Sequence, residues 1–201
     1  MRMLYFGNYD SEYGRNRVIA KGLRENGVEV VFCNGGTIGG IKKFFRLFLR
    51  YFEISNKRFD FITVAWPAQE TMIAASPLLL FLRFFRRTPV VVDMLTSHYD
   101  GYILDRKRYS PRSFHAKWYR WLDRMAVRLA DVALVDCYSA GRFLNKELGI
   151  PEEKINTVFI GTDDSVLRPK VESDYKDQHS FLVHFHGSFV PLQGVQYIIE
   201  A

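Results

Sequence analysis

Short apolar runs alternate along the chain with longer segments in which apolar residues recur at helical spacing. The apolar runs predict strands at residues 2–6, 28–32, 59–65, 90–92, 132–135 and 155–160. The segments between them predict helices at residues 13–26, 41–52, 72–85, 111–130 and 139–148. Regular alternation of this kind is typical of a parallel sheet with helices on both faces, so we expect an α/β, Rossmann-like, doubly wound fold.

The predicted helix at 111–130 has the clearest periodicity. Ser110 precedes it as an N-cap, and Pro111 stands in its first turn. The apolar residues of one face are Phe114, Trp118, Leu122, Met125 and Leu129. We expect this face to be buried against the sheet.

The last part of the chain predicts a second unit. A polar stretch at 171–180 separates the first domain from a new apolar run at 181–185 and a glycine-containing turn at 187–194. A helical pattern then continues to Ala201. We therefore expect a Rossmann-like domain at 1–170, a linker at 171–180, and the incomplete beginning of a second Rossmann-like domain at 181–201.

Composition and charge narrow the class of protein. Hydrophobic residues make up 48% of the chain and charged residues 25%, which excludes a disordered chain. The net charge of +6 favours an anionic partner, such as a nucleotide, a phospholipid surface, a nucleic acid or a phosphorylated substrate.

Metal, redox and membrane-spanning classes are not indicated. Cys33 and Cys137 form no CxxC motif, and His184 and His186 have no acidic or thiol ligand nearby, so we expect no metal site. The N-terminus lacks a signal-peptide pattern, and the apolar segment at 72–85 is too short to cross a bilayer. We expect a cytoplasmic protein, either free or attached to the cytoplasmic face of a membrane.

The richest cluster of candidate site residues follows the predicted strand at 90–92. Asp93, His98 and Asp100 are the candidate catalytic residues, because carboxylates and imidazoles orient hydroxyls and transfer protons. His98 could instead make a structural hydrogen bond, and Asp93 could cap the loop. Arg106 could hold a phosphate, or it could belong to a solvated charge run at 105–108.

The first predicted strand ends in Gly7 and Asn8, but the turn that follows lacks the GxGxxG spacing of a dinucleotide site. Glycine would let a ligand approach the backbone closely, and the next helix start could hold an anion with Arg15 and its neighbours at 16–17. An ordinary βα turn with solvated cations is the alternative.

The predicted helix at 41–52 is strongly amphipathic. Its basic arc consists of Lys42, Lys43, Arg46 and Arg50. Two interpretations are open: the helix lies on anionic lipid, or its phenylalanines pack on the sheet while the cations face water. Single-stranded nucleic acid is disfavoured, because a stacking surface would expose its rings rather than segregate them.

Several stretches together resemble retaining glycosyltransferases of GT-B fold, in the family 4-like group. The segment at 155–164 with Leu167-Arg168-Pro169 resembles the V-x-x-G-x-D … F-x-P end of their first domain. The segment at 186–195 resembles the first strand, glycine loop and helix of their second domain, and 129–136 resembles an A-D-x-V-x-x-x-S/T strand. The loop at 93–107 is similar to an acceptor-side loop.

This resemblance implies two Rossmann-like domains that face each other across a cleft, with the acceptor bound by the first and the nucleotide-sugar by the second, without a metal or other cofactor. It assigns donor binding to Gly7, Asn8, Gly187 and Ser188. It assigns acceptor binding to Tyr99, Arg106 and Arg15. The chain departs from the family in having Gln193 where a lysine is common and Leu95 near the position of a catalytic histidine, with His98 three residues later.

Two hypotheses follow. In the first, the chain is the first half of a glycosyltransferase of the hexosyltransferase type, inactive alone, that serves envelope, lipid-linked or polysaccharide synthesis. In the second, it is a non-catalytic module that binds a membrane or a partner through its basic amphipathic surface.

Overall fold

The computed structural model describes residues 1–164, 166–167, 184–187 and 189–201. The chain forms a parallel sheet with the strand order β2-β1-β3-β4-β5-β6. The strands are β1 (Arg2–Gly7), β2 (Glu29–Asn34), β3 (Phe61–Val64), β4 (Val90–Leu95), β5 (Val132–Val135) and β6 (Ile155–Thr157). The expected α/β fold with a doubly wound parallel sheet is confirmed.

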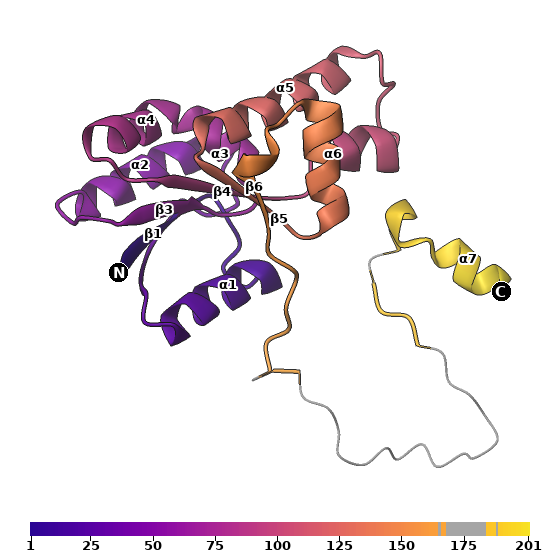
Figure 1. Ribbon diagram of the computed structural model, residues 1–201, viewed down its shortest axis with the longest axis horizontal. Coiled ribbons are helices and arrows are strands. Elements are labelled where there is room, and N and C mark those ends of the chain that lie inside the picture. Colours follow the sequence, from indigo (N-terminus) through magenta and orange to yellow (C-terminus); the bar gives the residue numbers. More distant parts are fainter. Residues whose placement is uncertain (165, 168–183, 188) are drawn as a thin grey trace, which may run out of the picture.

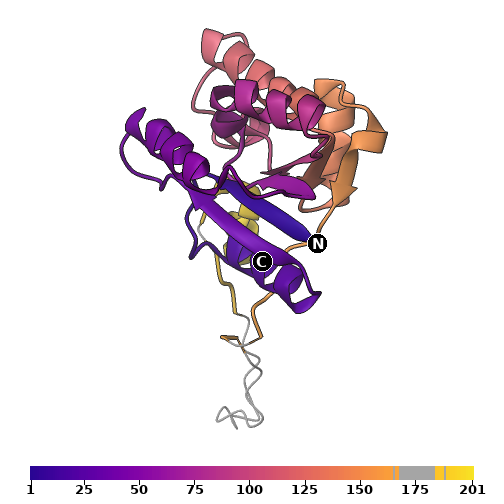
Figure 2. The same cartoon turned by 90° about the vertical axis from the view of Figure 1, so that its left-hand side faces the viewer.

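Helices cover the two faces of the sheet unequally (Figure 1). Helix α1 (Gly14–Glu25) covers one face, and after a quarter turn it still lies across the sheet from the helices of the other face (Figure 2). The opposite face carries α2 (Lys42–Ile54), α3 (Gln69–Ala74), α4 (Ser76–Phe85), α5 (Phe114–Leu129) and α6 (Tyr138–Leu148). Crossovers between parallel strands are right-handed. The step from β1 to β2 runs opposite to all later steps, and it therefore places α1 on the other face.

The core has two parts, separated by the sheet. Along β1, Leu4 and Phe6 point into the large core under α2–α6, while Met3 and Tyr5 point into the smaller core under α1. All four side chains are at most 1% exposed, as expected for a strand buried on both faces. Beyond α1 the second face is partly open, and an apolar hollow of about 430 Å³ runs over β3 to β5.

The predicted helix at 72–85 is wrong as a single element. The chain forms two helices there, α3 and α4, with a break at Ala75. Pro77 stands in the first turn of α4, where its missing N–H is tolerated, but inside a continuous helix its ring would clash with the carbonyl four residues earlier. The break therefore follows from one residue.

The start and the buried face of α5 also differ from the prediction. Ser113, not Ser110, is the N-cap, and its Oγ accepts a hydrogen bond from the Ala116 amide at 3.2 Å. Phe114 and Trp118 are exposed. The buried residues of the helix are Ala116, Leu122, Asp123, Ala126 and Val127.

Three short helical segments complete the described elements. They are η1 (Asp100–Asp105), a π-helical turn, and the 3₁₀ turns η2 (Glu152–Lys154) and η3 (Pro191–Gln193). Helix α7 (Val195–Glu200) agrees with the helix predicted near the C-terminus. The predicted linker at 171–180 lies outside the described residues, as does most of the predicted strand at 181–185.

No helix in the described part of the chain is both long and apolar enough to cross a membrane. Within the same residues, no group of three or more His, Cys, Asp or Glu side chains is placed to hold a metal ion.

Candidate functional site

The carboxyl ends of β1, β3, β4 and β5 lie side by side, because these strands are neighbours in the sheet. The strand order reverses at this place, with β2 on one side of β1 and β3 on the other. Ligands of open α/β sheets bind outside the carboxyl ends of the strands at such a point. This edge is therefore the candidate site.

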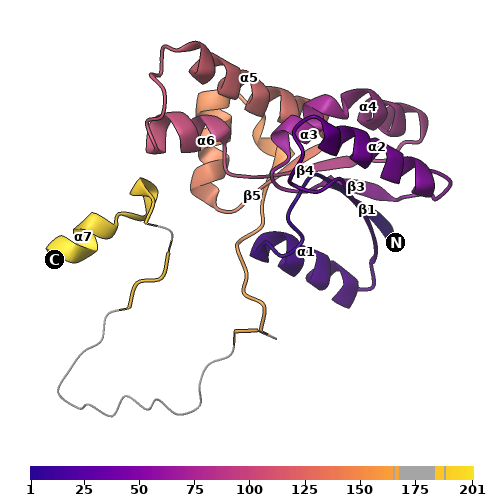
Figure 3. The ribbon, with the colours of Figure 1, turned by 180° about the vertical axis from the view of Figure 1, so that it is seen from behind.

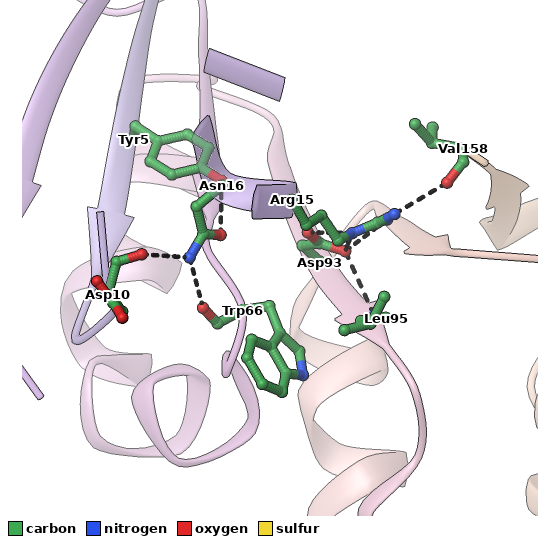
Figure 4. A network of polar contacts seen from close by, with 8 residues as sticks. All are labelled: Tyr5, Asp10, Arg15, Asn16, Trp66, Asp93, Leu95 and Val158. Atoms are coloured by element: carbon green, nitrogen blue, oxygen red, sulfur yellow. Dashed lines mark hydrogen bonds and ion pairs between the residues drawn. The ribbon is translucent and has the colours of Figure 1, made fainter. Parts of the chain in front are cut away.

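Arg15, in the first turn of α1, ties β4 to the chain that leaves β6 (Figure 4). Its Nε donates to Asp93 Oδ2 at 2.8 Å, its Nη2 donates to Asp93 Oδ1 at 2.9 Å, and its Nη1 donates to the Val158 carbonyl at 2.9 Å. The two charged side chains are 3% and 0% exposed. Burial raises the pKa of the Asp93 carboxyl, and the bidentate guanidinium opposes that rise.

This geometry corrects two predictions. Asp93 was a catalytic candidate, and Arg15 was a candidate for acceptor binding. The carboxylate and the guanidinium are buried against each other, so neither group faces a ligand. Both residues hold the site in shape.

Asn16, the next residue of α1, connects β1, the turn after it and the end of β3 (Figure 4). Its Oδ1 accepts a hydrogen bond from the Tyr5 hydroxyl at 3.0 Å. Its Nδ2 donates to the carbonyls of Asp10 and Trp66 at 2.9 and 3.2 Å. The first turn of α1 thus organises the strand ends, and this role was missed by the sequence analysis.

An anion site at residues 15–17 is not supported. Arg15 is bonded to Asp93, and the Asn16 amide is bonded to two carbonyls. Arg17 lies 3.2 Å from Asp163, which Lys21 also contacts at 2.7 Å. These contacts hold the chain after β6 against α1 and leave no free cation in the first turn.

Gly7 and Asn8 end β1 at the centre of this edge. Gly7 has a φ of +149°, a conformation that favours glycine. Asn8 is 2% exposed, and among the described residues neither its Nδ2 nor its Oδ1 has a hydrogen-bond partner. A buried amide without partners costs free energy. The assignment of Gly7 and Asn8 to ligand binding is compatible with the unpaired Asn8 amide, and it stays a prediction.

Asp123 of α5 caps the segment that follows β4. It is fully buried and accepts hydrogen bonds from Ser97 Oγ at 2.7 Å and from the His98 and Tyr99 amides at 3.1 and 2.9 Å. These amides begin the helical turns that continue into η1, and such first amides need an acceptor from elsewhere. Asp123 therefore fixes the position of the candidate catalytic residues.

The sequence analysis missed Asp123, although one signal was available. It is the only acidic residue between Arg106 and Ala130, and it stands next to Leu122 on the buried side of the helix. An acid at a buried helix position requires polar partners.

His98 and Tyr99 are packed inside this segment. The His98 side chain is 12% exposed, lies 3.8 Å from Glu70 through its Nδ1, and contacts the rings of Tyr102 and Tyr119. Tyr99 is 6% exposed with the Arg120 guanidinium 4.4 Å above its ring. Tyr99 is therefore a packing residue, which corrects its assignment to acceptor binding.

Asp100 and Arg106 are the more accessible residues of this segment. Asp100 is half-buried at the start of η1, and its amide donates to Ser97 Oγ at 3.0 Å. Burial raises the pKa of its carboxyl, and the nearby carboxylates of Asp105 and Asp123 raise it further. Arg106 is exposed, with its guanidinium 5.7 Å from the centre of the Tyr102 ring. The catalytic prediction for Asp100 is compatible with this placement.

An aromatic pair that the sequence analysis did not single out lies at the same edge. The rings of Tyr13, the N-cap of α1, and Trp66, after β3, are stacked with centres 4.6 Å apart. Asp136 follows β5, and its buried Oδ1 has no hydrogen-bond partner among the described residues. Burial raises the pKa of the Tyr13 hydroxyl, Arg15 lowers it, and the carboxylates of Asp93 and Asp136 raise it.

The basic arc of α2 is not a uniform exposed surface. Arg46 Nη1 donates to the Gly35 carbonyl at 2.9 Å, and Arg50 Nη1 donates to the Asn34 carbonyl at 2.6 Å. Lys43 lies over the Phe44 ring, and Lys42 is exposed. Arg46 and Arg50 thus bond the chain at and just after the end of β2 while remaining exposed, and the membrane-facing set stays a prediction.

The donor side of the predicted cleft is described only in part. Gly187 belongs to the described residues, and Ser188 lies outside them. The assignment of both residues to donor binding stays a prediction.

Comparison with known proteins gives a match at the level of structure only. No family model matches the chain, and no curated protein matches it. Similar solved structures include Anabaena HepE in complex with UDP and glucose and HepE in complex with UDP, each at 14% identity, with TM-scores of 0.46 and 0.45. Each match covers 83% of this chain and 46% of HepE, so the chain spans about half the length of these structures.

Proposed function

We propose that this chain is the acceptor-binding half of a retaining glycosyltransferase. The reaction would transfer a hexose from a nucleotide-sugar to an envelope, lipid-linked or polysaccharide acceptor, without a metal or other cofactor. The proposal extends the family resemblance of the sequence. The observation that carries it is the placement of Asp100, half-buried with a raised pKa, on a segment that a buried carboxylate fixes at the carboxyl edge of the sheet.

Asp100 has a defined role in this proposal. Its carboxylate orients the acceptor hydroxyl and takes its proton as the acceptor oxygen bonds to the anomeric carbon on the same face from which the nucleoside diphosphate departs, so that the configuration is retained. The rest of the catalysis is positioning of the two substrates and electrostatic support of the positively charged sugar in the transition state. Most of the donor binding is assigned to the second domain, so the 201-residue chain alone is expected to be inactive.

A transfer assay with the gene product that carries this chain tests the proposal. Radiolabelled UDP-, GDP- and dTDP-sugars are supplied with membrane lipid and polysaccharide acceptors. Asp100→Asn is expected to lower kcat by about 10²- to 10⁴-fold, the range of a lost general base. Because the pKa of Asp100 is raised, the acid limb of the kcat/KM profile should lie above the ordinary aspartate pKa of about 3.9.

Asp105→Asn is the matched control, since Asp105 ends the same turn. It should leave kcat within about twofold of wild type. Equal losses in the two variants would contradict the role of Asp100. Absence of transfer from every donor would contradict the proposed function.

A second function, attachment to an anionic membrane surface, rests on a different observation. Residues 35–52 and 71–92 contain seven Lys and Arg and no acidic residue. Helices α2 and α4 lie on the same face of the sheet (Figures 1 and 3), and Arg86 Nη1, just after α4, donates to the Ser55 carbonyl at the end of α2. The exposed apolar residues of these helices and of the position before α2 are Ile41, Phe45, Leu49, Phe52, Phe81, Phe84 and Phe85. Exposed rings beside cations suit the interface of anionic lipid.

Vesicle sedimentation tests this second proposal, which places the protein on the cytoplasmic face of the membrane. Binding to phosphatidylcholine vesicles that contain phosphatidylglycerol is compared with binding to phosphatidylcholine alone. Phe84→Ser with Phe85→Ser should lower the partition coefficient at least about tenfold, because each ring would lose its burial in lipid. Phe159→Ser, at an exposed ring after β6, should change it little. Unchanged binding of the double variant would refute the surface.

A further inference from the structure

We propose that Tyr13, Trp66 and Asp136 form a subsite for a neutral sugar ring of the acceptor. The proposal rests on the proposed transferase function only where it calls the sugar an acceptor. Recognition of the sugar ring itself depends on these three side chains. They come from the start of α1, the end of β3 and the end of β5. None of them belongs to the segment that carries Asp100.

The aromatic pair is held in place by its backbone. The Trp66 carbonyl accepts a hydrogen bond from Asn16 Nδ2 at 3.2 Å, and the Asn16 side chain is itself buried (Figure 4). Tyr13 is the N-cap of α1, and its amide donates to the Asp10 carbonyl at 3.4 Å. The two rings lie 29° from parallel, with Tyr13 38% exposed and Trp66 half-buried. A rigid, partly exposed ring pair is thus available at the edge.

The spacing fits one or two sugar rings. Trp66 and Asp136 follow β3 and β5, which lie on either side of β4. Neighbouring strands are about 4.8 Å apart, so the two strand ends are separated by roughly 10 Å. The C–H face of a pyranose packs on the negative face of an aromatic ring. A hydroxyl at its far side could then donate to the unpaired Asp136 Oδ1.

The charges select a neutral ligand over a phosphate. Arg15 stands two residues after Tyr13, and its guanidinium is bonded to Asp93 and to the Val158 carbonyl. The Asp93 and Arg15 charges cancel, so Asp136 leaves the subsite with a net negative charge. An anionic ligand group would be repelled, whereas hydroxyl groups would supply the donor that a buried carboxylate oxygen needs.

Fluorine NMR of the chain labelled with 5-fluorotryptophan tests this subsite without any donor. The chain has three tryptophans, so Trp118→Phe and Trp121→Phe assign the three resonances. Neutral gluco-, manno- and galacto-oligosaccharides are titrated, with glucose 1-phosphate as the anionic probe. We expect an oligosaccharide to shift the Trp66 resonance, and glucose 1-phosphate to leave it in place.

Variants separate recognition from folding. Trp66→Ala and Asp136→Asn should each weaken oligosaccharide binding about tenfold or more, and Trp66→Phe should retain part of it. Trp118→Ala is the matched control, because Trp118 and Trp121 form a second stacked pair on helix α5, with ring centres 5.0 Å apart. This control should bind as wild type does.

Two results would overturn the subsite. The first is a Trp66 resonance that no neutral oligosaccharide moves. The second is an equal loss of binding in Trp66→Phe, Trp66→Ala and Trp118→Ala. A moving Trp66 resonance in a protein that transfers no sugar would support the subsite and contradict the proposed function, so the two failures are distinguishable.

Discussion

Replacement of Arg15 with alanine should lower the free energy of unfolding by about 3–5 kcal/mol. The change removes the bidentate partner of Asp93, whose carboxylate is 0% exposed, and leaves a buried charge without compensation. It also removes the hydrogen bond from Nη1 to the Val158 carbonyl, which holds the chain after β6. Urea unfolding followed by circular dichroism measures the loss.

Two controls make this test specific. Arg17→Ala removes a cation from the same turn, but its side chain is 39% exposed, so the loss should stay below about 1 kcal/mol. The double replacement Arg15→Met with Asp93→Leu removes both charges and should be less destabilising than Arg15→Ala alone. A loss below about 1 kcal/mol in Arg15→Ala would show that Asp93 does not depend on this guanidinium.

The pH dependence of Arg15→Ala has a definite sign. Burial raises the pKa of Asp93 in the folded protein, and loss of Arg15 removes the main opposing interaction. A carboxyl with a raised folded pKa favours the folded state below its unfolded pKa, about 3.9, and this contribution is lost as the pH rises through the folded pKa. The deficit of Arg15→Ala relative to wild type should therefore be larger at neutral pH than under mildly acidic conditions.

The fold was largely predictable because its signals are local. Each of the six apolar runs predicted within residues 2–160 overlaps an observed strand, and the central strands, buried on both faces, must be largely apolar. The last of these strands, β6, is shorter than predicted, and its end has a structural reason. The strand predicted to run to Ile160 stops at Thr157, where the Val158 carbonyl turns to Arg15 instead of a neighbouring strand.

The face that α5 buries was not predictable from periodicity alone. The sequence offers large apolar residues on one side and smaller ones on another, and the helix buries Ala116, Ala126 and Val127 while Phe114 is 76% exposed. Small residues allow α5 to approach α3 and the sheet closely. Which side is buried depends on those neighbours, and they are far away in the sequence.

The sequence identified only part of the candidate site, because the partners of its side chains are also far away in the sequence. Asp93 lies inside β4, and His98 and Asp100 follow the strand closely, so the sequence placed all three near its carboxyl end. Their partners are long-range: Arg15 is 78 residues from Asp93, and Asp123 is 25 residues from His98. A one-dimensional pattern contains no signal for such pairings, so the structural roles of Asp93 and Arg15 emerged only from the fold.

Replacement of Asp123 with alanine should loosen the segment that carries Asp100 and destabilise the protein by about 3 kcal/mol or more. The change leaves the Ser97 hydroxyl and the His98 and Tyr99 amides without their acceptor, and each buried unpaired donor costs about 1–3 kcal/mol. Ser97→Ala removes one of these bonds and should cost about 1 kcal/mol. Asp123→Asn, which retains one oxygen, should fall between the two.

Hydrogen exchange separates this local effect from global unfolding. In Asp123→Ala, the amides of His98 and Tyr99 should exchange much faster than that of Val92 in β4, because the capping bonds are lost while the strand keeps its ladder. Sugar transfer should fall as well, although Asp123 touches no substrate, since Asp100 loses its fixed position. Equal acceleration at all these amides would instead mean that Asp123 supports the whole fold rather than the placement of Asp100.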